Sequence, residues 1–143
     1  MQLAPSTPSS TPFAPTRPIG LRLPRQPAGG LSDWQVRRVT AHIDANLGAT
    51  LRTGTLAALL GLSVSHFTRA FKHSVGVPPR VYVIRRRLAA ACEAMLVSSE
   101  PLTVIAHHHG FCDQSHFTRT FHEVIGVAPQ AWRRRQGWAL EAA

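Results

Sequence analysis

A short stripe of polar side chains in the middle of this sequence is suited to bind a partner rich in hydrogen-bond acceptors. Its members recur at i, i+3, i+4 and i+7: Ser65, Thr68, Arg69 and Lys72. That spacing places all four on one face of a helix, and Phe67, Phe71 and Val75 form an apolar stripe on another face. Arginine and lysine bind phosphate, and arginine also pairs with two acceptors on guanine. The pattern predicts a helix with one face for a core and one for a charged partner.

The same stripe returns fifty residues further along the chain. Residues 65–71, SHFTRAF, are repeated at 115–121 as SHFTRTF, and Gly76 matches Gly126. The repeated stripe consists of Ser115, Thr118, Arg119 and His122. Upstream the offset falls by one, because the second copy has one more residue in a turn. Self-similarity at a fixed spacing indicates a duplicated structural unit. A repeat that served packing alone would not need the same polar face twice.

Each stripe follows a short apolar helix and a turn that contains glycine. In the first copy, 53–60 predicts the short helix and 64–74 the polar helix, with Ser63 as its N-cap. The second copy has the same order, with Asp113 as N-cap. This order is that of a helix-turn-helix motif, whose second helix enters the major groove of DNA. We expect two such motifs, at about 53–76 and 101–126.

A long amphipathic helix is predicted between the two motifs. It begins at Pro79 and ends at about Val97. Its apolar stripe consists of Val81, Ile84, Leu88, Ala91 and Met95. A helix of this length spans nearly 30 Å, which is close to the roughly 34 Å of one turn of DNA. As a rigid spacer it would hold two recognition helices over successive major grooves.

The expected fold is all-α, with about seven helices in two helix-turn-helix subdomains joined by the linker helix. A first helix opens at Ser32 and Asp33 and runs to about Leu47, with Trp34 as a packing residue. The DNA-binding domain is expected to cover 31–136, with a tail at 137–143. Residues 1–30 contain seven of the eleven prolines together with Ser, Thr and Ala, so we expect this Pro/Ser/Ala-rich segment to be disordered.

Composition limits the partners of the chain. Its 143 residues include sixteen basic and seven acidic ones, which gives a net charge of +9. This excess predicts a polyanion as partner, either nucleic acid or an anionic membrane surface. No apolar run approaches the roughly 18–20 residues of a membrane span, and the N-terminus lacks the apolar core of a signal peptide. We therefore expect a cytoplasmic protein that binds double-stranded DNA and no membrane.

Residues that could support catalysis or metal binding are few. Cys92 and Cys112 are too few for a disulfide framework, and we expect both to be small core residues. His107, His108 and His109 are adjacent, and neighbours on a helix point about 100° apart, so they cannot converge on one metal ion. No phosphate loop or paired-carboxylate motif is present. We expect no enzyme activity, no metal, no cofactor and no small-molecule site.

The sequence resembles the AraC/XylS family of bacterial transcription regulators in three places. Residues 61–71 are similar to the family's first helix-turn-helix motif, and Arg87-Leu88 with Ala91 is similar to its central pattern. The strongest resemblance begins at Ile105-Ala106 and ends at Trp132-Arg133, where the chain has IAxxxGFxDQSHFxRxF followed by GVxPxxWR. The resemblance covers about residues 31–136. Gly54, His108 and His109 depart from the family pattern.

The resemblance implies a sequence-specific transcriptional regulator, most often an activator that recruits RNA polymerase, acting at the nucleoid of a bacterial cell. The residues expected to contact bases are Ser65, Thr68, Arg69, Gln114, Ser115, Thr118 and Arg119. Those expected to contact the DNA backbone are Lys72, Arg85, Arg86, His122 and Arg133. Arg69 and Arg119 suit guanine, and Gln114 suits adenine. Arg87 matches the family's recurring arginine, for which we expect an ion pair with Asp113.

Two alternatives remain open at this point. The chain could be an architectural protein that binds nucleic acid without sequence preference, because charge alone supports such binding. It could also be the isolated DNA-binding fragment of a longer, effector-responsive regulator, since nothing in residues 1–30 can fold into an effector domain. His66 and His116 flank the polar stripes and have no assigned role.

Overall fold

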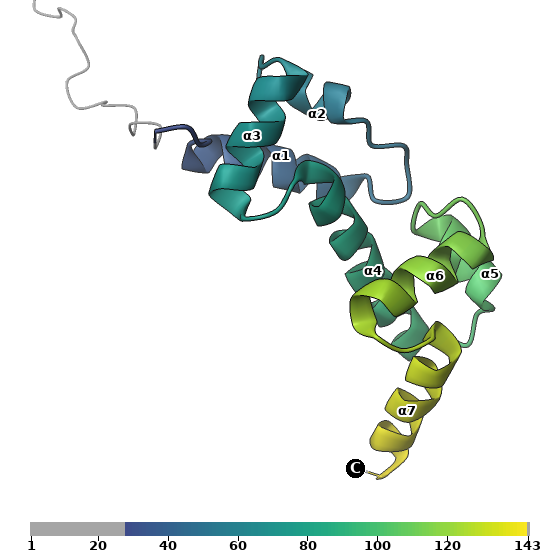
Figure 1. Ribbon diagram of the computed structural model, residues 1–143. Coiled ribbons are helices and arrows are strands. Elements are labelled where there is room, and N and C mark those ends of the chain that lie inside the picture. Colours follow the sequence, from purple (N-terminus) through teal and green to yellow (C-terminus); the bar gives the residue numbers. More distant parts are fainter. Residues whose placement is uncertain (1–27, 143) are drawn as a thin grey trace, which may run out of the picture.

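The computed structural model describes residues 28–142, and the described chain folds into seven α-helices without a strand (Figure 1). The helices are α1 (Asp33–Ala45), α2 (Thr53–Leu59), α3 (Val64–Val75), α4 (Pro79–Val97), α5 (Leu102–His108), α6 (Gln114–Ile125) and α7 (Pro129–Ala142). This confirms the all-α prediction. Most of the segment expected to be disordered, residues 1–27, lies outside the described residues.

Two separate hydrophobic cores lie on either side of α4. The first joins α1, α2 and α3 and contains Phe67 and Phe71, both fully buried. The second joins α5, α6 and α7 and contains Phe117 and Phe121 in the same positions of the repeat. Figure 1 shows α4 running from one group of helices to the other. The chain is thus two subdomains that share one helix.

The linker helix faces both cores, and this changes its predicted stripe. Leu88, Ala91 and Met95 are buried in the second core as expected. Val81, however, is 36% exposed, and Val83 is buried in the first core instead. The reason is that the first turns of α4 pack against a different group of helices from its last turns. A single straight stripe therefore does not describe α4.

The two repeats cap their polar helices and bury their residues in the same way. Ser63 Oγ accepts a hydrogen bond from the His66 amide (3.1 Å), and an Asp113 carboxylate oxygen accepts one from the His116 amide (2.7 Å). Gly76 and Gly126 end the two helices in the left-handed conformation, with φ of 96° and 91°. From position 65 to 80, each residue has the same degree of exposure as its partner fifty residues later, except His66 and His116.

The extra residue of the second copy is Cys112. Leu62 and Phe111 make the same bond, each amide donating to a helix carbonyl five residues back at 3.0 Å. The first copy then proceeds directly to its N-cap, whereas the second passes through Cys112 first. Cys112 is exposed, so the prediction that it is a core residue is wrong. An exposed turn absorbs the insertion, and α6 keeps its orientation.

Three expectations at the helix ends differ from the structure. Trp34 is 47% exposed, so it is not a packing residue of the core. The first helix ends at Ala45, before Leu47. The last helix extends to Ala142, through most of the residues expected to be a tail. Within residues 28–142, no helix combines the length and the apolar character needed to cross a membrane.

Removal of the second cap should destabilise the domain. We expect Asp113→Ala to lower the free energy of unfolding by about 1 kcal/mol, because the His116 amide loses its acceptor. Asp113→Ser should retain most of the stability, since serine caps α3 in the first repeat. Urea denaturation measures both variants. Equal losses for Ala and Ser would show that capping is not the role of Asp113.

Candidate nucleic-acid interface

The helices α3 and α6 each expose one polar face at opposite ends of α4. On α3, Ser65, Arg69 and Lys72 are exposed and Thr68 is half-buried. The matching residues of α6 are Ser115, Arg119, His122 and Thr118, and they show the same degrees of exposure. Opposite these faces lie the phenylalanines that fix each helix to its core. The structure therefore brings each predicted stripe together on a rigid, solvent-facing helix surface.

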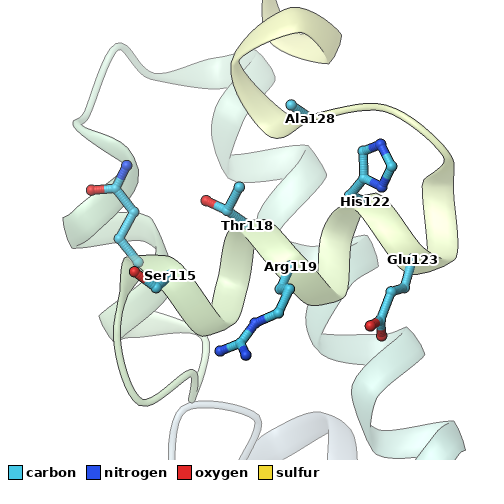
Figure 2. Close-up of a pocket in the computed structure, with 7 residues that line it drawn as sticks. Ser115, Thr118, Arg119, His122, Glu123 and Ala128 are labelled. Carbon is cyan, nitrogen blue, oxygen red and sulfur yellow. The ribbon is translucent and has the colours of Figure 1, made fainter.

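The face of α6 borders a surface hollow (Figure 2). Its lining consists of Gln114, Ser115, Thr118, Arg119, His122, Glu123 and Ala128. Arg119 and Glu123 extend to one side of α6, and Thr118 and His122 extend to the other, toward Ala128. Glu123 is one helical turn after Arg119, so the helical period could have predicted it as part of this face. A carboxylate here repels phosphate and can accept from cytosine N4.

The two central arginines of the stripes differ in their contacts. Arg69 Nε donates to the carbonyl of Ser65 in its own helix at 3.3 Å. Arg119 has no hydrogen-bond or ion-pair partner among the described residues. Both side chains are exposed. Neither guanidinium is tied to another helix, so the remaining donors of both can face a ligand.

The predicted backbone-contacting arginines of α4 divide into two kinds. Arg86 Nε donates to the Asp44 carboxylate at 2.8 Å, and about two-fifths of each side chain is exposed (44% and 42%). This bond is the main reason that the pKa of Arg86 is raised above its usual value. Arg85 is exposed and has no partner among the described residues. Of the two, only Arg85 presents a guanidinium without an internal contact.

The expected ion pair between Arg87 and Asp113 does not form. Arg87 Nε donates to the Leu47 carbonyl at 2.9 Å, and its Nη2 donates to the Ala49 carbonyl at 2.7 Å. The Asp113 carboxylate caps α6 instead. Leu47 and Ala49 lie in the loop after α1, outside its helical hydrogen bonds, so their carbonyls can accept from a donor on another element. Partial burial lowers the pKa of Arg87.

Arg133 makes the corresponding contacts in the second subdomain. Its Nε, Nη1 and Nη2 donate to the carbonyls of Met95 (3.2 Å), Glu100 (2.7 Å) and Ser98 (2.6 Å), at the end of α4 and in the chain that follows. Every nitrogen of this guanidinium is used inside the protein. Sequence reasoning assigned Arg133 to the DNA backbone because unpaired helix-end carbonyls cannot be seen in a sequence.

The cysteines and the three adjacent histidines do not form a metal site among the described residues. No group of three His, Cys, Asp or Glu side chains suited to a metal ion occurs within the described part of the chain. His109, the C-cap of α5, has its Nδ1 2.7 Å from the Ile105 carbonyl in the last turn of that helix. Cys92 is half-buried against the second core, and burial raises the pKa of its thiol to about 11. At neutral pH that thiol stays protonated and unreactive.

Comparison with known proteins identifies the fold and the family. A family model described as a helix-turn-helix domain matches residues 56–135. A transcriptional regulator of Chromobacterium violaceum with an AraC-type DNA-binding domain has a solved structure that is similar to this chain. The two are 25% identical with a TM-score of 0.67, over 71% of this chain and 90% of that one. The chain belongs to the AraC-type helix-turn-helix family.

Two other similar proteins are also regulators of transcription by their descriptions. The DNA-binding domain of the global transcriptional factor AdpA, solved in complex with a target DNA, is 25% identical with a TM-score of 0.68, over 71% of this chain and 91% of that one. The probable transcriptional regulator LumQ of Photobacterium leiognathi is 31% identical over 74 residues, which are 52% of this chain and 30% of LumQ. The chain thus spans less than a third of that regulator. The matched residues of this chain form an AraC-type DNA-binding domain.

The contacts of Arg133 predict a structural and not a DNA-binding role. We expect Arg133→Ala to lower the free energy of unfolding by about 2–3 kcal/mol, because the carbonyls at the end of α4 lose a charged donor. Arg134→Ala is the control, since Arg134 is exposed and has no partner among the described residues; it should change stability by less than about 0.5 kcal/mol. Thermal unfolding measures both variants.

DNA binding of the same variants separates the two roles of Arg133. A phosphate contact would reduce the slope of log K against log salt concentration by about one when it is removed. We expect the slope of folded Arg133→Ala to equal that of the wild type. A reduced slope with unchanged stability would return Arg133 to the DNA-contacting set.

Proposed function

We propose that this AraC-type domain binds DNA sequence-specifically and reads two adjacent major-groove segments of one duplex, with α3 and α6 as recognition helices. The observation that carries the proposal is the matched exposure of the two polar stripes on helices that are capped and packed in the same way. Packing alone would require only the phenylalanine face. Solvent exposure leaves both stripes accessible to a groove.

The length of α4 suits this arrangement. Its 19 residues correspond to roughly 28 Å, against about 34 Å for one turn of DNA. The major groove is about 12 Å wide and admits one α-helix. The similar domain of AdpA was solved with a target DNA, which supports DNA as the partner of this chain as well. Two different stripes would then bind two different half-sites.

Different residues are proposed to supply specificity and affinity. Arg69 and Arg119 pair with guanine, and Gln114 pairs with adenine. The hydroxyl side chains add weaker base contacts: Ser65, Thr68, Ser115 and Thr118. Lys72, His122 and Arg85 contact phosphates, which position the helices without reading sequence. We leave Arg86 and Arg133 out of this set because both already have partners inside the protein.

The regulatory consequence is also part of the proposal. We infer that the domain acts at the nucleoid of a bacterial cell and most often activates transcription by bringing RNA polymerase to a promoter. An architectural role without sequence preference is the second candidate, and the net charge of +9 favours it. Competition of a selected duplex by random duplex at stated salt separates the two, because only a specific regulator retains the selected duplex.

The footprint tests the two-helix model directly. We expect one monomer to protect an asymmetric site of about two helical turns, roughly 20 base pairs. Hydroxyl-radical cleavage should show two protected regions on one face of the duplex. The duplex would be one selected by the protein from a random-sequence pool. A palindromic site, or protection of a single turn, would contradict the proposal.

The two central arginines should each specify a base pair. We expect Arg69→Ala and Arg119→Ala each to lose about 1–3 kcal/mol of binding and to relax specificity at one position, in different half-sites. Lys72→Ala is the matched control on α3 and should weaken all sequences alike. Selection from randomised duplexes with each variant measures this. If the arginine variants also weaken all sequences equally, both arginines are backbone contacts.

A further inference from the structure

The two subdomains meet where a loop of the first and a turn of the second lie so close that neither segment has room for a side chain at its glycine. A Cβ atom added to Gly48, in the loop between α1 and α2, would lie 2.6 Å from the carbonyl oxygen of His108. One added to Gly110, in the turn between α5 and α6, would lie 2.6 Å from the carbonyl oxygen of Leu47. Figure 1 shows this loop and this turn side by side. Backbone therefore packs directly against backbone.

Arg87 lies in the same contact. It extends from α4 and donates to the carbonyls of Leu47 (2.9 Å) and Ala49 (2.7 Å), on the loop of the first subdomain. A Cβ atom on Gly110 would lie 2.7 Å from its Nε and 2.8 Å from its Cζ. The turn of the second subdomain thus rests on a guanidinium that holds the loop of the first. Gly48, Gly110 and Arg87 form what we call the inter-subdomain junction.

The duplication shows that this close packing is specific to the second copy. Gly61 occupies the turn position that matches Gly110, and both have positive φ, 68° and 83°. Positive φ explains glycine at both positions. An added Cβ atom at Gly61, however, would meet nothing within 4 Å. The need for empty space is therefore confined to Gly110, the copy that faces the other subdomain.

His116 also differs between the two copies of the repeat. It is the one residue from 115 to 130 whose exposure differs from that of its partner in the first copy, since His66 is exposed and His116 is half-buried. His116 packs edge-on against Phe111, with ring centroids 5.6 Å apart. It also lines a hollow between the subdomains together with Arg52, Val83 and Arg87. The second copy is thus altered on the side that faces the first.

We propose that the inter-subdomain junction fixes the orientation of α6 relative to α3 and thereby sets the number of base pairs between the two half-sites. The helix α4 contributes to both cores and so attaches each subdomain at one place. The junction adds a second point of attachment beside α4. Gly48, Gly110 and Arg87 are positioning residues that touch no DNA. This inference rests on the proposed use of both helices on one duplex.

The test compares glycine substitutions that do and do not enter the junction. Gly48→Ala is the main variant, because Gly48 has no positive φ and its only conflict is with His108. Gly110→Ala is the second variant, with Gly61→Ala as its control for strain at positive φ. Gly54→Ala is a control for an unobstructed position, where the nearest atom would be 3.9 Å away. Gly48→Ala carries the test if Gly110→Ala does not fold.

Binding to duplexes of altered spacing is the first measurement. The wild type selects a duplex from a random pool, and one or two base pairs are then inserted or removed between its half-sites. We expect Gly48→Ala to lose about tenfold in affinity at the original spacing and to prefer a different or broader spacing, because simultaneous engagement depends on geometry. Its affinity for duplexes with one half-site scrambled should stay within about twofold of the wild type. Gly54→Ala and Gly61→Ala should keep the original optimum.

A distance measurement without DNA is the second. Spin labels at His73 and Glu123, exposed and matched across the repeat, would be attached through cysteine in a Cys92→Ala, Cys112→Ser background. We expect one narrow distance distribution for this background and for Gly54→Ala, and a shifted or broadened one for Gly48→Ala and Arg87→Ala. Unchanged distances together with an unchanged spacing optimum would overturn the junction. Binding of the wild type to one half-site only would overturn the proposed two-helix function, while the distances would still test the junction.

Discussion

Each helix-turn-helix unit of this chain has too little apolar surface to enclose its own aromatic pair. In each repeat, two phenylalanines of the polar helix are fully buried, at positions 67 and 71 and at 117 and 121. Neither short apolar helix, of seven residues, can cover them alone. The shared helix α4 supplies surface to both cores, Val83 to the first and Leu88 to the second. Because each core buries the apolar side of its polar helix, the hydrogen-bonding side faces solvent.

The arginines divide according to what their guanidinium groups meet. Arg87 donates to carbonyls of the loop after α1, and Arg133 donates to carbonyls in the last turn of α4 and just after it. Arg86 pairs with a carboxylate of α1, whereas Arg119 meets no partner in the part of the chain that the structure describes. A net charge of +9 predicts a polyanion. It does not tell which cations are available to one, since that depends on where helices end in space.

Local patterns predicted most of the fold, and features that depend on packing between helices were missed. Caps and helix-ending glycines such as Ser63 and Gly76 act within a few residues, so spacing revealed them. On α4, Val83 is buried and the predicted Val81 is exposed. The reason is that α4 packs against two cores on different sides, whereas the prediction assumed one periodic stripe. The predicted ion pair of Arg87 with Asp113 does not form, because Asp113 caps α6 and Arg87 donates to loop carbonyls after α1.

The candidate site was predictable to a similar degree and for the same reason. The repeat in the sequence predicted both polar stripes, and the structure places them on exposed faces. Whether these faces contact DNA bases stays a prediction. Glu123 was not predicted because the polar stripe was defined by hydrogen-bond donors, although this carboxylate lies one turn after Arg119. The contact of Gly110 with Leu47 was beyond sequence reasoning, since it joins segments more than sixty residues apart.

The last turns of the two polar helices give the molecule an electrostatic polarity. Lys72 of α3 corresponds to His122 of α6, and His73 corresponds to Glu123, so the last turn of α6 has lost a lysine and gained a carboxylate relative to that of α3. If both helices bind one duplex as proposed, the α3 end is held more strongly, and the α6 end detaches first as salt rises. A bound domain would then point in one direction along a promoter, so inverting its site should change the distance and side from which it acts on transcription.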